Sequence, residues 1–433
     1  MLSNHKQLAI NPLKEKSVYF KNLDGLRFFA AFAVIIGHCQ ALLYVEKGGI
    51  DPYSPWASKL ANFGVDFFFV LSGFLITYLT IAEIEKTGKI DIKKFYLRRV
   101  LRIFPLYFGF GIVALTFGKF FLDWVGYYQQ EFDFTQQPYT LKDYFTNLGF
   151  LFTFSVNIQA MVGWHGGVSS MMVGHFWSLA VEEQFYLIWA PVVYFLRKRA
   201  WVAIILFTVI GYIFCNIPPK NVEQYTSFFI NFTVNKFFQF GIGGLLSLLI
   251  FYKIDTLIFE KGLVVFTEGL FRFTGFLGKK IQAAVATITP VLGVIYIGFI
   301  LFLQFLILRK VAMYLFGNVY YQEEEHVYNV FAAVGIIWVA IFQHSILDYF
   351  LLETKPLKYL GRISFGVYVF HEIGIRVSNK LLETQQIDLK SSTYHILLPL
   401  FATIFATVFA ALSYQYFELY FLKMKHKFEA YKK

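Results

Sequence analysis

Long apolar runs recur along the whole chain of 433 residues and are the strongest feature of its pattern. A transmembrane helix needs about 20 largely apolar residues. Ten runs approach or exceed this length, at residues 24–45, 60–82, 100–122, 174–196, 200–218, 226–252, 284–308, 327–348, 363–385 and 394–420. The pattern predicts an all-α fold, a polytopic membrane helical bundle of about 10 transmembrane helices.

The stretch 145–162 is also apolar but short, and the distribution of charge decides how we interpret it. Loops rich in Lys and Arg stay on the cytosolic side of a membrane. If 145–162 crossed, the basic run 197–199 would lie outside, whereas a re-entrant or interfacial stretch keeps that run inside. We therefore expect 145–162 not to cross and both termini to be cytosolic. Every basic cluster except 309–310 fits this topology.

The composition supports the membrane assignment and excludes a soluble protein. Hydrophobic residues make up 57% of the chain and charged residues 15%, with a mean hydropathy of +0.54, whereas soluble domains are about a quarter charged. Basic cytosolic loops explain the net charge of +11 better than binding to nucleic acid does. We expect a multi-pass protein of the cell (inner) membrane without a cleavable signal peptide. It comprises a cytosolic N-terminal segment (1–22), a transmembrane domain (23–420) and a cytosolic basic tail (421–433).

The first span carries two ionisable residues on one helical face. Arg27 lies near the expected cytosolic end, and His38 lies about 16 Å deeper on nearly the same face. A phosphorylated, elongated cofactor such as coenzyme A matches this arrangement, since it has phosphates at one end and a thioester at the other. A packed histidine with a snorkelling arginine explains the same spacing, so both interpretations stay open.

Basic residues also cluster where the third span begins. Arg99 and Arg102 lie one turn apart, so they can clamp phosphate oxygens in a bidentate manner that Lys cannot reproduce. Arg98 precedes them, and Tyr107 follows in the same segment. The alternative is that these arginines only set the topology, because Arg is common at cytosolic helix ends.

Further ionisable residues fall at membrane depth, where their energetic cost makes them candidates for function. Asp66 opens the second span, Glu182 lies in the fourth, and Lys236 lies in the sixth. His371 lies at a depth comparable to those of His38 and Glu182. We therefore expect these three side chains to approach one level. The sequence contains no metal-ligand spacing and no Gly-rich phosphate loop.

Several segments, in this order, resemble the acyltransferase-3 family of membrane O-acyltransferases, over residues 23 to about 420. They are 23–27 (LDGLR) followed by His38, 64–74 (GVDFFFVLSGF), 95–107 (FYLRRVLRIFPLY), Trp177-Ser178-Leu179 with Glu182, 360–368 (LGRISFGVY) with His371, and Ser413-Tyr414 with Glu418. The resemblance identifies 23–420 as a transmembrane acyltransferase domain.

The resemblance implies an enzyme that moves an acyl group from cytosolic acyl-CoA, such as acetyl-CoA, to a hydroxyl of an extracytoplasmic glycan or similar surface molecule. It implicates Arg27 and His38 in catalysis, and it implicates Arg99 and Arg102 in handling the cofactor. The expected partners are acyl-CoA, a glycan or lipid-linked glycan acceptor and membrane lipids, with no metal and no nucleic acid. The oligomeric state stays open.

As a hypothesis, His38 takes the proton of an acceptor hydroxyl as that hydroxyl attacks the thioester, and Glu182 or Asp66 orients the imidazole or the acceptor. Direct transfer and an acyl-histidine intermediate both remain open. In the sixth span, Lys236 and Gln239 replace the arginine and acidic residue of the family pattern. A proton-coupled or small-molecule transporter is the main alternative, but the sequence has no inverted repeat.

Overall fold

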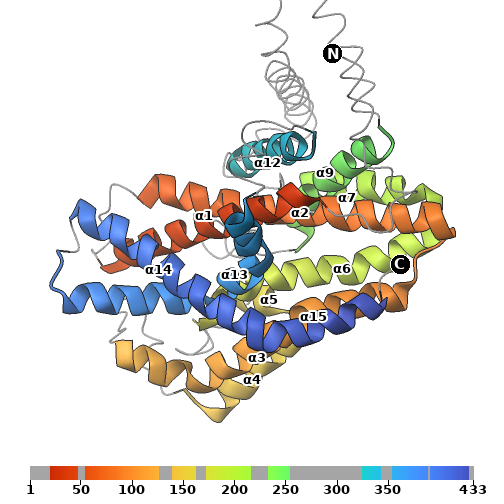
Figure 1. Cartoon of the computed structure of the whole chain (residues 1–433). Coiled ribbons are helices and arrows are strands. Elements are labelled where there is room, and N and C mark those ends of the chain that lie inside the picture. The colour runs from red at the N-terminus through yellow and green to blue at the C-terminus, as the bar shows by residue number, and fades with distance from the viewer. Residues whose placement is uncertain are drawn as a thin grey trace, which may run out of the picture.

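The computed structural model describes residues 20–46, 54–125, 139–161, 172–215, 233–253, 324–342, 354–388 and 391–428. Within these ranges every regular element is a helix (Figure 1). The longer helices are α1 (Lys21–Glu46), α2 (Ser54–Thr87), α3 (Ile92–Val125), α4 (Leu141–Phe152), α6 (Trp177–Leu196), α7 (Ala200–Cys215), α9 (Thr233–Phe251), α12 (Glu324–Phe342), α13 (Lys355–Thr384) and α14 (Ser392–Ser413). Shorter elements are α5 (Val156–Met161), η4 (Gly174–Phe176), η5 (Arg197–Arg199), η8 (Tyr414–Glu418), α15 (Leu419–Lys425) and η9 (His426–Phe428).

Five of the described helical segments are long and apolar enough to cross a membrane. They are Asn22–Leu43, Trp56–Thr87, Ile92–Val125, Thr233–Phe251 and Ser392–Lys425. The all-helical, multi-pass prediction is thereby confirmed, while the count of ten spans and the orientation of the termini remain predictions. The predicted span 284–308 lies outside the described residues. Helix α7 has 16 residues, and α13 carries many polar side chains, so neither meets the same criteria.

The stretch 145–162 falls on two short helices. α4 has 12 residues and α5 has 6, and Phe154 between them has a positive φ of 50°. A helix of 12 residues is about 18 Å long, which is short of the roughly 30 Å of a bilayer core. Neither helix can span on its own, and the topology of this stretch remains a prediction.

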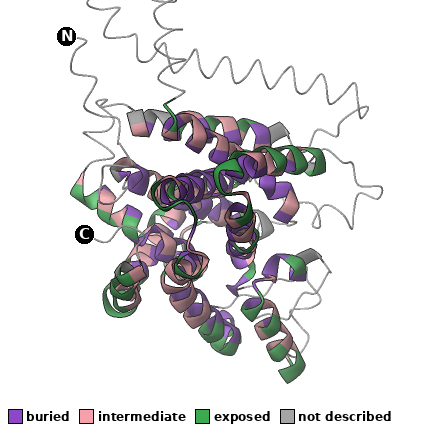
Figure 2. Cartoon of the chain, turned by 90° about the vertical axis from the view of Figure 1, so that its right-hand side faces the viewer, coloured by how far each residue is buried: buried purple, intermediate pink, exposed green. Residues whose placement is uncertain are grey.

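Close helix contacts fix the arrangement of the bundle. α1 packs against α2 and α13, α9 packs against α2 and α7, and α13 packs against α14. A Cβ on Gly361 of α13 would come within 2.0 Å of the carbonyl oxygen of Asp24 on α1. A Cβ on Gly73 of α2 would likewise lie 2.1 Å from the carbonyl oxygen of Phe240 on α9. Small residues let these backbones approach closely. The buried faces of the helices turn toward the middle of the bundle (Figure 2).

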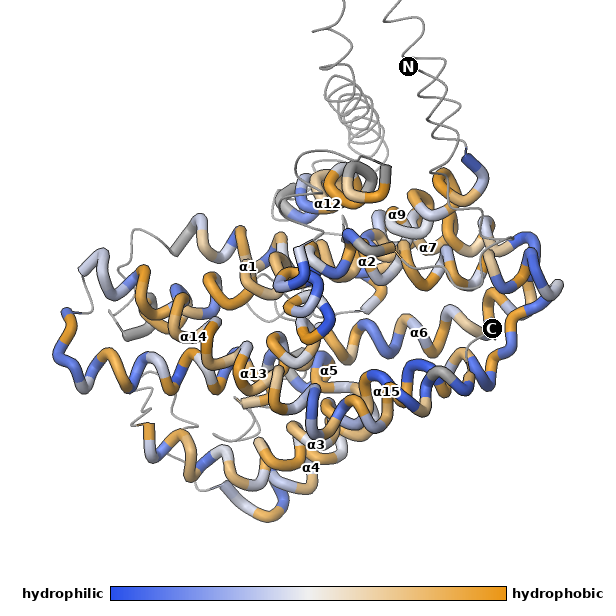
Figure 3. Tube along the Cα trace, in the orientation of Figure 1, coloured by the Kyte–Doolittle hydropathy of each residue, from blue (hydrophilic) through white to orange (hydrophobic). Residues whose placement is uncertain are grey.

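Hydrophilic residues gather near α15 and the neighbouring end of α3 (Figure 3). Asp91 precedes α3 and accepts the N–H of Lys94 at 3.0 Å, and this hydrogen bond lowers the pKa of the Asp91 carboxyl. Arg98 donates to Glu83 Oε2 and to the carbonyl oxygen of Phe428, both at 3.0 Å. Arg98 therefore ties α2, α3 and η9 together.

Candidate active site

Five helices (α1, α2, α3, α6 and α13) surround a pocket with a volume of about 110 Å³. Arg27 comes from α1 and Arg99 and Arg102 come from α3, so three of the predicted residues line one space. Among the described residues of this lining, Glu182 is the only acidic one, and most of the others are apolar. The pocket therefore suits an anionic ligand that also has an apolar part.

Local contacts hold two of the pocket's arginines. Arg27 forms an ion pair with Asp24, one turn earlier on α1. The guanidinium carbon of Arg99 lies 4.5 Å from the centroid of the Tyr186 ring, a cation–π contact. Within the part of the chain that the structure describes, neither Arg99 nor Arg102 makes a hydrogen bond or an ion pair. Their N–H groups are thus available to a ligand.

Glu182 forms part of the pocket wall. Its Oε1 accepts hydrogen bonds from the hydroxyls of Ser72 and Tyr186. Glu182 is half-buried and lines the same pocket as the three arginines. It does not contact His38.

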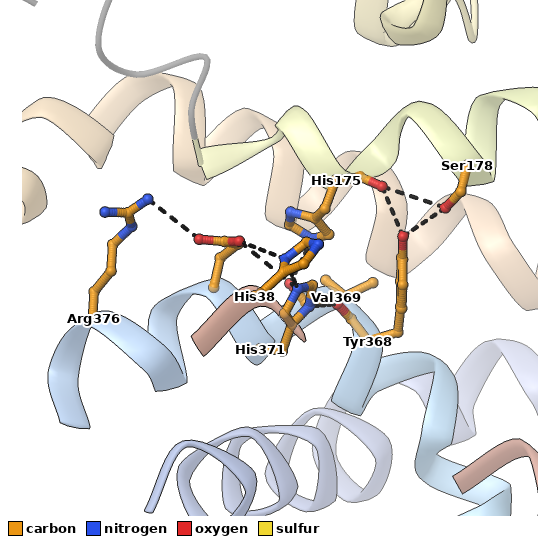
Figure 4. Close-up of polar contacts among 8 residues, drawn as sticks. His38, His175, Ser178, Tyr368, Val369, His371 and Arg376 are labelled. Atoms are coloured by element: carbon orange, nitrogen blue, oxygen red, sulfur yellow. Dashed lines mark hydrogen bonds and ion pairs between the residues drawn. The ribbon is translucent and has the colours of Figure 1, made fainter. Parts of the chain in front are cut away.

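A tyrosine joins this pocket to a second group of polar side chains (Figure 4). Tyr368 of α13 lines the pocket together with Ser178 of α6, and their hydroxyl oxygens lie 2.6 Å apart. The Tyr368 hydroxyl donates to the carbonyl oxygen of His175 at 2.9 Å. One turn further along α13, His371 belongs to the second group, so the two regions are contiguous.

The second group is centred on two histidines in direct contact, and we call His38, His371 and Glu372 the histidine cluster (Figure 4). His38 Nδ1 lies 2.9 Å from His371 Nε2 and 2.9 Å from Glu372 Oε1. Arg376 donates from Nη2 to Glu372 Oε2 at 3.3 Å. The His371 side chain is fully buried, whereas that of His38 is 33% exposed. Of the two, His38 is the one that a substrate can reach.

The hydrogen bonds assign the tautomers of both rings. A carbonyl oxygen can only accept, so the contact of 2.5 Å between His371 Nδ1 and the Tyr368 carbonyl places a proton on that Nδ1. His371 Nε2 in the neutral ring is then an acceptor. His38 Nδ1 thus faces two acceptors, which places its proton on Nδ1 and leaves its Nε2 with a free lone pair.

Helical spacing on α13 explains this arrangement. Tyr368, Glu372 and Arg376 follow one another at intervals of four residues, so they share one face. His371, three residues after Tyr368, borders this face, and α1 presents His38 to it. The close approach at Gly361 brings these two helices together.

Asp66 belongs to a different polar group, between α2, α9 and α12. It accepts from His326 at 2.6 Å, from Asn329 at 2.9 Å and from Gln239 at 3.2 Å. Lys236 lies close enough to interact with its charge, and both Asp66 and Lys236 are buried. Asp66 does not line the pocket and does not contact His38.

The remaining predicted residues have packing or bonding roles around these sites. Tyr107 is fully buried, and its ring stacks on Phe154 at 4.8 Å between centroids. Trp177 packs edge-on against Phe69 of the pocket lining at 6.2 Å. Glu418, at the π-helical turn η8, accepts from Ser413 at 2.9 Å. Arg98 and Tyr107 lie close in sequence to Arg99 and Arg102 but do not line the pocket.

Sequence reasoning missed Glu372, Arg376, His175 and His326. For Glu372 a signal was present, since it is a carboxylate at membrane depth directly beside His371. His326 is 260 residues away from its partner Asp66, so no local pattern predicts their contact.

Comparison with known families decides the classification. A family model described as an acyltransferase domain matches residues 20–415. The chain belongs to the acyltransferase-3 family. The resemblance found in the sequence is thereby confirmed.

The chain is similar to O-acetyltransferases of bacteria. It is 26% identical over 419 residues to "O-acetyltransferase OatA" of Staphylococcus aureus, covering 92% of this chain and 57% of the relative. It is 27% identical over 384 residues to "Peptidoglycan O-acetyltransferase OatA" of Listeria monocytogenes, covering 85% and 51% of the two chains. The chain thus spans about half the length of the curated relatives it matches. No solved structure matches the chain significantly.

Proposed function

We propose that this acyltransferase moves an acetyl group from acetyl-CoA, bound from the cytosol, to a hydroxyl of a cell-surface glycan such as peptidoglycan. The names of its relatives support the acetyl group and the glycan. The observation that carries the proposal is the hydrogen-bonded pair of His38 and Glu372, which His371 and Tyr368 connect to a pocket lined by three arginines.

The pocket supports coenzyme A as the donor. Arg27, Arg99 and Arg102 bring three positive charges to one space, where Glu182 is the single carboxylate among the described lining residues. The phosphates of coenzyme A are polyanionic, and guanidinium groups recognise phosphate oxygens in a bidentate manner. The apolar part of the lining suits the thinner, less charged arm that carries the thioester. By the positive-inside rule, this end of the bundle faces the cytosol.

The tautomer of His38 suits general base catalysis. Glu372 accepts the Nδ1–H of His38, so Nε2 can take the proton from the acceptor hydroxyl. The hydroxyl oxygen then forms a bond to the thioester carbon, and the bond from that carbon to sulfur breaks. The proton on Nε2 passes to the departing thiolate. The Glu372 carboxylate stabilises the imidazolium that exists between these two proton transfers.

Arg376 and His371 position this pair. Arg376 holds the second oxygen of Glu372, which fixes the carboxylate toward His38. His371 offers a second acceptor to His38 Nδ1, which further favours the proton on that nitrogen. Glu182 and Asp66, which the sequence suggested as orienting carboxylates, do not contact His38, and we assign the orienting role to Glu372.

Replacing His38 by Ala tests the proposal. We expect acetyl transfer to fall by at least about a hundredfold, since general base catalysis contributes roughly 10²–10⁴-fold. Purified, reconstituted protein is supplied with labelled acetyl-CoA and peptidoglycan fragments, and the label in the glycan is counted. His395→Ala is the matched control, because His395 bonds Gln40 of α1 at 3.0 Å but lies outside the histidine cluster. If folded His38→Ala protein transferred acetyl groups at the wild-type rate, the role of His38 as general base would be refuted.

A further inference from the structure

The three polar atoms at the centre of the histidine cluster are spaced as metal ligands are. His38 Nδ1 lies 2.9 Å from both Glu372 Oε1 and His371 Nε2, and those two atoms lie 3.8 Å apart. Among the described residues, this is the one group of three or more His, Cys, Asp or Glu side chains whose ligand atoms converge in this way.

These separations allow a zinc ion at its usual distance from all three atoms. A point equidistant from the three atoms lies about 1.9 Å from each, and moving it about 0.7 Å out of their plane gives roughly 2.05 Å, the usual Zn–N distance. Two histidines and a glutamate with an open fourth position are a common ligand set for zinc.

The protons of the cluster point to the same conclusion. His371 Nδ1 donates to the Tyr368 carbonyl, so its Nε2 presents a lone pair. His38 Nδ1 carries one proton, and that proton faces the lone pairs of both His371 Nε2 and Glu372 Oε1. One donor therefore serves two acceptors within 3.8 Å of each other, whereas a cation interacts favourably with all three atoms at once.

Outer contacts orient the ligands as they do in established metal sites. A ligating histidine usually donates its other N–H to a carbonyl or carboxylate, and a ligating carboxylate is itself hydrogen-bonded. His371 makes the first contact, to the Tyr368 carbonyl at 2.5 Å. Glu372 makes the second, to Arg376 at 3.3 Å. The ligands are thus held in place without an ion.

We propose that His38, His371 and Glu372 bind Zn²⁺ or a similar divalent d-block cation, and that the bound ion inhibits acyl transfer. The inhibition rests on the proposed function of His38. A cation on Nδ1 moves the proton of the neutral ring to Nε2, so His38 loses the lone pair that accepts the hydroxyl proton. Imidazole ligands suit zinc, copper and cobalt, whereas Mg²⁺ and Ca²⁺ prefer oxygen ligands.

Metal binding is measured directly on the purified full-length protein after treatment with a chelator. Titration with Co²⁺ is followed by the visible absorption of four-coordinate cobalt, and Zn²⁺ affinity is measured by competition with a chromogenic chelator. We expect one ion per chain, with binding about 100-fold or more weaker in His371→Ala and in Glu372→Gln, because loss of merely an outer contact costs 10- to 100-fold. His395→Ala keeps wild-type binding, and Mg²⁺ does not compete.

Transfer assays on the same samples test the inhibition. Zn²⁺ abolishes acetyl transfer by the wild-type protein, and excess chelator restores it. If Co²⁺ gives no four-coordinate spectrum with the wild-type protein, the proposed metal site is refuted, even if the variants fail to fold. If the chelator-treated protein is inactive and Zn²⁺ restores its activity, the proposed inhibition by the ion is refuted. If Zn²⁺ binds as expected but His38→Ala still transfers acetyl groups, the proposed function fails while the metal site stands.

Discussion

Replacing Glu372 by Gln isolates the charge of the carboxylate beside His38. The substitution keeps the shape of the side chain and an oxygen that can accept the Nδ1–H of His38. In the wild-type protein His38 Nδ1 lies 2.9 Å from Glu372 Oε1. It removes the negative charge that faces the imidazolium during the reaction. We therefore expect kcat to fall while the protein stays folded.

The magnitude follows from two bounds. A hydrogen bond to a charged group contributes about 1.5–3 kcal/mol and a neutral one about 0.5–1.5 kcal/mol, so the loss is at least roughly 1 kcal/mol. Unit charges 2.9 Å apart interact by about 6 kcal/mol at an effective dielectric of 20, which is the upper bound. Each 1.36 kcal/mol is a factor of ten in rate. A fall in kcat of about 10- to 1,000-fold lies between these limits.

Initial rates at varied acetyl-CoA concentration, in proteoliposomes with a glycan acceptor, give both kinetic constants. The KM for acetyl-CoA should change little, because Glu372 does not line the arginine pocket. Arg376→Lys is the matched comparison, since it keeps a positive charge beside Glu372 and should lower kcat less than Glu372→Gln does. Wild-type kcat in well-folded Glu372→Gln protein would refute the orienting role.

Three further predictions concern other parts of the chain. Arg99→Lys and Arg102→Lys should raise the apparent KM for the acyl donor about 10- to 100-fold and change that for the acceptor little, because each loses a charged bidentate contact. Unchanged donor KM values would mean that these arginines only set the membrane topology. Cysteines introduced at positions 128 and 170 in a cysteine-free background should both be labelled from outside by an impermeant reagent, and labelling from opposite sides would refute the predicted topology. Asp66→Asn should lower the free energy of unfolding by about 1–3 kcal/mol, because it impairs a buried hydrogen-bond network. The rate of transfer per folded molecule should stay within about threefold of wild type. A large loss of rate at unchanged stability would contradict this prediction.

The sequence predicts the elements and the depth of the polar residues, because both follow from local patterns. The helical character of the described chain is confirmed, and so are several helices long and apolar enough to span a membrane. Arg27 and the pair Arg99 and Arg102 line one pocket, as a shared ligand requires. His38 and His371 meet at 2.9 Å, as their comparable depths suggested.

Depth alone does not predict which faces of two helices meet. Glu182 was expected at the level of His38, but α6 turns it toward Ser72 and the pocket arginines. The partner of His38 is instead Glu372 of α13, and that pairing depends on the close approach of α1 and α13 at Gly361. Such an approach involves residues more than 300 positions apart, which no periodicity in the sequence encodes.

The departure in the sixth predicted span has a structural explanation that leaves the transfer site intact. Gln239 donates its amide to Asp66 Oδ1 at 3.2 Å, which an acidic residue could not do in its ionised form. Lys236 supplies positive charge near the same buried carboxylate, and His326 Nδ1 contacts it at 2.6 Å. A buried anion is stable only when it is paired and hydrogen-bonded, so this set of side chains forms a self-consistent network between α2, α9 and α12. Among the described residues the network shares none with the pocket or with the histidine cluster, and we therefore infer that the departure bears on how these helices pack.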